Sequence, residues 1–199
     1  MRDRLATVVW LAVLALWGAP ARGQPYAEMR LSTAKYRYVD VGYTFGSGVV
    51  LDGLYSGAPG LNELYLGAGL AWQATPSLSL TPIVYGVVGL DAGSEERGIA
   101  IGSYITFDKG PYKLIAFVGR FFRTQGDVPS YDFLDTGDLT RVVSGPWELG
   151  VSSTVYRTEG EWSHQTGPML KRSDARGFWS LSARFGFDDE LRLVRVLYF

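Results

Sequence analysis

The segment WELGVSSTVYR, residues 147–157, alternates between apolar and polar side chains. Its apolar side consists of Trp147, Leu149, Val151, Ser153 and Val155, with one serine in the row. Successive side chains of a β-strand point to opposite sides of the sheet, so this segment predicts a strand with one apolar and one polar side. The segment FWSLSARFGF, residues 178–187, repeats the pattern. Both segments indicate an all-β fold.

The same alternation recurs along the chain, and no helical apolar period is sustained beyond residue 35. It predicts ten strands, with eight as the alternative, at 36–45, 48–55, 63–73, 77–90, 98–107, 112–123, 147–157, 162–170, 178–187 and 190–199. Residues 36–199 are therefore expected to form one domain. Residues 24–35 are either a periplasmic lead-in or an extension of the first strand.

The gaps between these segments differ in length. Short gaps fall at 46–47, 74–77, 108–111, 158–161 and 188–189, whereas the gap at 125–145 is long and polar. Short turns at one end and long loops at the other are typical of antiparallel barrels in the bacterial outer membrane. The predicted fold is thus a closed antiparallel transmembrane β-barrel, with 125–145 as a long external loop.

The first 23 residues have the features of a secretory signal peptide. Arg2 and Arg4 precede an uncharged apolar run at 5–17, and small residues follow it. The run is too short for a spanning helix, which needs about 20 residues. Cleavage is expected near Gly23, with Ala21 as the competing position.

The composition excludes several classes of protein. The chain has no cysteine, 47% hydrophobic residues and a formal net charge of −1. A disulfide scaffold, a disordered tail and a nucleic-acid-binding surface are all inconsistent with these values. No cofactor motif and no metal-binding motif is present in the sequence.

The positions of the aromatic residues indicate whether water or lipid surrounds the barrel. On the expected outer faces they stand at the strand ends, as Trp72, Tyr112 and Trp162 do beside short gaps and Trp147 and Trp179 beside long ones. Two aromatic rows with aliphatic residues between them are typical of the two interfaces of a membrane. Alternation also turns Arg120 and Arg195 outward, where a bulge or snorkelling toward an interface is needed.

Signal peptide, alternating strands and the ending VRVLYF, residues 194–199, together resemble the bacterial outer-membrane β-barrel superfamily. The resemblance implies an outer-membrane location among lipid and lipopolysaccharide. It also implies insertion by the barrel-assembly machinery, which reads the last strand ending in Phe199.

The inner faces hold small residues, tyrosines and charges that could pair. The predicted lumen charges are Asp40, Asp52, Glu63, Lys113, Glu148, Arg184 and Arg192. This set is consistent with a narrow interior filled by its own side chains.

Candidate chemistry is sparse. His164 is the only histidine, and the expected topology places it beside a periplasmic turn, the wrong end for a lipid-A-modifying enzyme. The loop at 125–145 holds four acids that could ligate calcium, although a solvated acidic loop explains them better: Asp127, Asp132, Asp135 and Asp138.

Three functions are compatible with these features. The first is a non-enzymatic barrel with a structural or loop-mediated binding role, carried out by 125–145. The second is a narrow channel or passive transporter for small solutes. The third is a lipid-A-modifying enzyme that depends on His164, with an enzyme less expected than either alternative.

Overall fold

The computed structural model describes residues 23–91 and 96–199, so the predicted signal peptide lies outside them except for Gly23. The described residues form thirteen strands: β1 Gln24–Ser32, β2 Arg37–Thr44, β3 Val49–Ala58, β4 Leu61–Leu70, β5 Trp72–Thr75, β6 Leu78–Gly89, β7 Arg97–Lys109, β8 Tyr112–Gln125, β9 Tyr131–Ser144, β10 Trp147–Thr158, β11 Glu161–Asp174, β12 Gly177–Gly186 and β13 Glu190–Tyr198. Among the described residues, no helix is long and apolar enough to cross a membrane.

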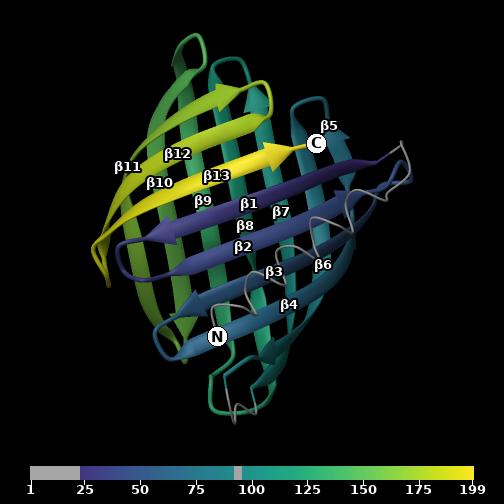
Figure 1. Cartoon of the computed structure of the whole chain (residues 1–199), viewed down its shortest axis with the longest axis vertical. Coiled ribbons are helices and arrows are strands. Elements are labelled where there is room, and N and C mark those ends of the chain that lie inside the picture. Colours follow the sequence, from purple (N-terminus) through teal and green to yellow (C-terminus); the bar gives the residue numbers. More distant parts are fainter. Residues whose placement is uncertain (1–22, 92–95) are drawn as a thin grey trace.

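The strands close into an antiparallel barrel (Figure 1). The first and last strands pair side by side, with Tyr26 opposite Tyr198, and β4 pairs with β6 from Glu63 to Gly69. Within the described ranges, twelve strands form the ring, and β5 is a short outside strand that pairs with β6 alone. The prediction of a closed all-β barrel is confirmed, but both predicted strand numbers, ten and eight, are wrong.

Two strands account for the difference. β1 occupies the predicted lead-in and pairs with β2 on one side and β13 on the other. β9 occupies most of 125–145, so the prediction of a long external loop there is wrong. The connection between β8 and β9 is only 126–130. An unexpected strand at this point reverses the direction of every strand that follows it.

The two ends of the barrel differ. The terminal end carries Gln24 and Phe199, whose backbone N–H donates to the Pro25 carbonyl at 3.1 Å, and its turns are short: 45–48, 76–77, 110–111, 145–146 and 175–176. The loop end carries the two longest connections, 90–96 and 126–130, together with 33–36, 59–60, 159–160 and 187–189. In the turn at 159–160, Glu159 and Gly160 have φ of 54° and 91°, as a two-residue type I′ hairpin requires.

The apolar faces point outward. In β4, Leu66 is 62% exposed and Leu70 57%, whereas Glu63 on the opposite face is 3% exposed. The same division holds in β10, where Leu149 is exposed and Glu148 is buried. In β12, likewise, aromatic and aliphatic side chains cover the outside. Such a surface needs hydrocarbon around it rather than water.

The two outward arginines are accommodated without a bulge at either residue. Arg120 of β8 donates to Asp132 of β9 at 3.0 Å, and Arg195 of β13 donates to Asp174 of β11 at 2.6 Å. Each guanidinium also lies over an outward ring, Phe122 for the first. A paired charge beside an aromatic side chain lowers the cost of an arginine near the membrane interface.

Candidate functional site: the interior of the barrel

The inner wall has two chemically different halves. A buried apolar and aromatic cluster fills the side formed by β2, β3, β6, β7 and β8, and it includes Tyr38, Leu54, Tyr85, Phe117 and Phe121. The other side, formed by β9 to β13 and β1, presents mainly hydroxyls and charges, although Tyr131, Phe133 and Tyr156 extend the aromatic surface onto β9 and β10. A solute inside the barrel would therefore meet one flat, largely apolar wall and one polar wall.

The larger internal space opens at the loop end and has a volume of about 480 Å³. We call it the vestibule. Residues of the turns at 33–36, 59–60, 126–130 and 187–189 contribute to its rim. This volume is within the range of about 300–1,000 Å³ that small-molecule sites occupy.

A layer of ion pairs narrows the interior below the vestibule. Arg30 of β1 pairs with Glu28 on its own strand and with Asp135 of β9. Glu190 of β13 pairs with Arg184 of β12 and, at 3.0 Å, with Arg192. The side chains of Arg30 and Arg184 are 2% and 0% exposed, so their charges are satisfied by the wall itself. Arg30, Asp135 and Arg192 form what we call the constriction.

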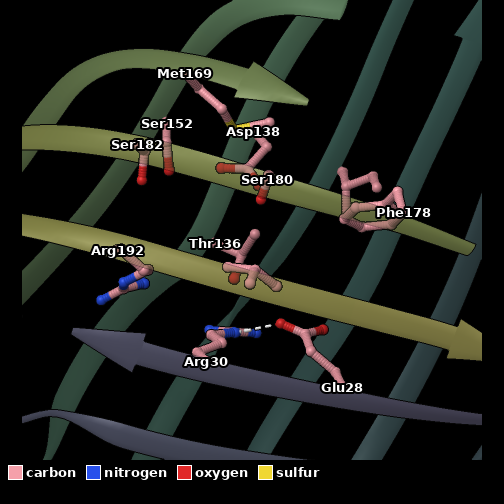
Figure 2. Close-up of a pocket in the computed structure, with 12 residues that line it drawn as sticks. Glu28, Arg30, Thr136, Asp138, Ser152, Met169, Phe178, Ser180, Ser182 and Arg192 are labelled. Carbon is pink, nitrogen blue, oxygen red and sulfur yellow. Dashed lines mark hydrogen bonds and ion pairs between the residues drawn. The ribbon is translucent and has the colours of Figure 1, made fainter. Parts of the chain in front are cut away.

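A second, smaller space of about 30 Å³ lies beyond the constriction, toward the terminal end. Figure 2 shows Arg30 and Arg192 projecting into it from neighbouring strands, with Glu28 bonded to Arg30. Its walls also carry hydroxyls and a buried carboxylate, from Ser152, Ser180, Ser182 and Asp138. The polar half of the interior thus continues below the constriction, with room for about one or two waters.

Two further clusters pack the interior. Asp40 and Asp52 accept hydrogen bonds from tyrosine hydroxyls: Tyr26 donates to Asp52 at 3.0 Å, and Tyr104 to Asp40 at 3.2 Å. Tyr38 and Tyr85 donate to the same two carboxylates.

Near the terminal end, Glu148 accepts from Lys113 at 2.9 Å and from Thr140 at 2.6 Å. Its second oxygen lies 3.4 Å from the Nζ of Lys171. One carboxylate thus holds two lysines from different strands at this mouth of the barrel.

The seven residues expected in the lumen all lie on the inner side of the wall: Asp40, Asp52, Glu63, Lys113, Glu148, Arg184 and Arg192. The structure adds partners that the sequence analysis missed, namely Glu28, Arg30, Lys171 and Glu190. A signal for the first two was present, since Tyr26, Glu28 and Arg30 alternate with Ala27, Met29 and Leu31.

The four acids proposed as a loop cluster are not brought together. Asp127 lies in the turn at 126–130, Asp132 points outward to Arg120, and Asp135 and Asp138 face the interior at different levels. Within residues 23–91 and 96–199, no group of three or more histidine or acidic side chains could hold a metal ion. A calcium site in this segment is therefore not supported.

His164 lies near the loop end rather than the terminal end, because β9 reverses the direction of β11. Its register partner is Val155, and its side chain is exposed on the outer, apolar face of the wall. The next residue, Gln165, is buried in the interior instead. The expected position of His164 beside a turn at the terminal end is thus wrong, and the imidazole does not face the polar groups of the lumen.

Comparisons with solved structures identify the class of barrel. A structure of KdgM porin matches with a TM-score of 0.62 at 11% identity, over 87% of this chain and 98% of that porin. NanC porin matches with a TM-score of 0.61 at 6% identity, over 88% of this chain and 99% of that chain. A KdgM porin structure in complex with disordered oligogalacturonate gives 0.61 at 10% identity, over 88% and 98% of the two chains.

These likenesses establish the fold as that of porin barrels. The predicted resemblance to outer-membrane β-barrels is confirmed at this level. No model of a protein family and no curated protein sequence matches the chain.

Proposed function

We propose that this chain is a porin-type channel of the bacterial outer membrane that passes small hydrophilic solutes. The observation that carries the proposal is the sequence of spaces along the interior of the barrel. A vestibule of about 480 Å³ narrows at the constriction and is followed by a second polar space. A barrel with a purely structural role can be filled by its own side chains, whereas this one keeps an open space of this size inside its wall.

The strand number supports a channel. Barrels of about eight strands have interiors just filled by side chains, whereas barrels of about sixteen leave a wide aqueous pore. Twelve strands lie between these limits. The result here is a barrel that is open at the loop end, in the vestibule, and nearly filled by side chains below the constriction.

The ends of the barrel fit the usual orientation of such proteins. Gln24, Phe199 and only short turns lie at one end, which we assign to the periplasm, and the two longest connections, 90–96 and 126–130, lie at the other. The vestibule then faces the outside of the cell. Insertion through the closing strand that ends in Phe199, among outer-membrane lipid and lipopolysaccharide, belongs to the same proposal.

The structural or loop-binding role loses its main support. That reading assigned the binding function to a long loop at 125–145, and this segment is largely the barrel strand β9. The connection left between β8 and β9 is 126–130, which lies at the rim of the vestibule. Its contribution is to the entrance of the lumen rather than to a separate binding surface.

Planar-bilayer recording tests the proposal directly. Purified full-length protein is reconstituted, and current is measured across single insertions in potassium chloride. We expect discrete, small conductance steps, because the constriction is narrow. A protein that is folded by its gel mobility but carries no current in dilute or concentrated salt would overturn the channel function.

A further inference from the structure

The vestibule is lined by a row of aromatic rings that contact one another edge to face or at a tilt, and we propose that the accessible rings of this row bind short neutral saccharides on their way into the channel. The inference deepens the proposed function, because it names a solute class for the same lumen. It concerns binding, however, and binding can be measured whether or not the barrel conducts. Its test is therefore separable from the test of conductance.

The row runs around one side of the vestibule, with each ring next to another. The centroid distances are 6.1 Å from Tyr65 to Tyr85, 6.1 Å from Tyr85 to Phe117, 5.2 Å from Phe117 to Phe133, 6.1 Å from Phe133 to Tyr131, 5.9 Å from Tyr131 to Tyr156 and 6.2 Å from Tyr156 to Phe187. All these residues line the cavity, but Tyr85 and Phe117 are only 0% and 6% exposed. The rings that a solute can reach are those of Tyr65, Tyr131, Phe133, Tyr156 and Phe187. We call them the aromatic row.

The geometry of a sugar ring suits this surface. A pyranose has apolar C–H groups on its faces and hydroxyls around its edge. Aromatic rings offer broad apolar faces, and a tyrosine adds a hydroxyl at its tip. A solute whose face lies against an accessible ring keeps the hydroxyls at its edge free for the polar groups nearby, and the cavity volume has room for a short saccharide.

Polar groups around the row can meet the hydroxyls of such a solute. Ser56, Ser163 and Gln165 line the same cavity. Glu63 accepts a hydrogen bond from the Tyr65 hydroxyl at 2.8 Å, and its carboxylate stands at the edge of the row. Aromatic faces with a few fixed polar groups are the usual composition of a small-molecule site.

The charges argue for a neutral solute. Arg192 is the only basic side chain lining the vestibule in the described part of the chain, and it is engaged by Glu190 at 3.0 Å. Glu63 and Asp188 also line the vestibule and form no ion pair with any residue of 23–91 or 96–199. A polyanion would thus meet the unpaired carboxylate of Asp188, and the one basic side chain that it could contact, Arg192, is already paired with Glu190.

A cation is not favoured either. The Glu63 side chain is almost wholly buried and is already hydrogen-bonded by Tyr65, so it presents little charge to the cavity. The acidic side chains deeper in the vestibule, Asp135 and Glu190, are both paired with arginines. Within the two described ranges, Asp188 is the one unpaired carboxylate among these acids, and most of the remaining lining consists of uncharged side chains, the aromatic row among them.

Titration calorimetry on the full-length protein in detergent micelles tests the inference. Maltose, a neutral disaccharide, is compared with digalacturonate, which has the same number of rings and two carboxylates, and with tetraethylammonium. We expect maltose to bind at least about fivefold more tightly than either charged probe. Equal or tighter binding of digalacturonate or of tetraethylammonium would overturn the inference, and so would the absence of maltose binding.

Variants connect the binding to the row. Tyr131→Leu combined with Tyr156→Leu should weaken maltose binding about tenfold, because each stacked ring contributes a factor of about two to ten. Tyr112→Leu is the matched control, since Tyr112 lies on the outer face and should leave binding unchanged. Phe133→Leu is a single substitution that serves if the double variant does not fold. Full binding by folded variants of the row would contradict the inference.

The test of conductance and the test of saccharide binding can therefore have different outcomes. In bilayers, maltose should interrupt the current of the native channel, and less so that of the row variants. Conductance without maltose binding would support the proposed channel function and overturn the inferred saccharide site. Maltose binding without conductance would support the saccharide site and overturn the channel function.

Discussion

Arg30 on β1 and Asp135 on β9 form an ion pair across the interior of the barrel, although 105 residues of sequence separate them. The pair joins two walls that are not neighbours in the sheet. It therefore closes part of the lumen and cross-links the barrel at the same level. The two effects can be separated by mutation.

Replacing one residue of this pair should destabilise the barrel. Replacing both should widen the channel. Arg30→Ala leaves the carboxylates of Asp135 and Glu28 without their partner, which typically costs about 3–5 kcal/mol. Asp135→Ala should cost less, because Arg30 keeps its pair with Glu28. We expect the double variant to lose less than the sum of the two single variants. Urea unfolding in detergent measures the free energies, and single-channel recording should show a larger conductance in the double variant.

The outward pair of Arg120 and Asp132 provides the matched control. Its side chains are 51% and 39% exposed, and the N–O distance is 3.0 Å. Removing either partner should cost only about 0–1 kcal/mol and leave conductance unchanged. Equal effects of the inner and outer substitutions would show that the pair between Arg30 and Asp135 does not narrow the pore.

Glu148→Gln should change the ion selectivity of the channel. Glu148 accepts from Lys113 at 2.9 Å and lies 3.4 Å from Lys171, so the substitution leaves two lysines facing each other at the terminal end. We expect a shift of the reversal potential toward anion selectivity under a salt gradient, together with a loss of stability of about 2–4 kcal/mol. Lys113→Gln should shift selectivity in the opposite direction. An unchanged reversal potential in both variants would place this cluster outside the conduction path.

Glycines on the inner face allow neighbouring strands to pack closely. A Cβ added to Gly167 of β11 would lie 1.8 Å from the carbonyl oxygen of Ala183 on β12, so Gly167→Ala must push the two strands apart. We expect a loss of more than about 2 kcal/mol in unfolding experiments. Gly86→Ala is the control, because nothing lies within 4 Å of its added Cβ. Similar stabilities for both variants would contradict this view of the wall.

The sequence predicted which side of a strand faces outward in segments such as β10 and β12, but not how many strands there are. Alternation was enough for β10 and β12, since one wall contacts hydrocarbon and the other contacts polar groups. It failed for β9, where Asp132, Asp135 and Asp138 made the segment read as a solvated loop. The position of each aspartate depends on contacts with other strands, which its neighbours in the sequence do not reveal. The partner of Asp132 lies on β8, and that of Asp135 lies on β1.

A bulge in β9 hid the strand further. Gly137 pairs with Ser153 and Leu134 with Val155, so two residues, Asp135 and Thr136, stand opposite Thr154 alone. Both project into the interior, which breaks the period of two on which strand prediction depends. The carbonyl of Asp135 accepts from the Thr154 hydroxyl at 2.8 Å and holds the bulge in place.

This bulge leads to a prediction about deletions. Removing Thr136 should restore regular alternation, because Asp135 would still face inward and Gly137 outward, with Asp138 inward as before. Removing Leu139 instead would turn the remaining residues of β9 to the opposite faces, and Thr140, which donates to Glu148 at 2.6 Å, would point into lipid. We expect the Thr136 deletion to fold and the Leu139 deletion to fail, as judged by the gel mobility of unheated samples. Failure of both deletions, or folding of both, would show that the bulge does not set the register of β9.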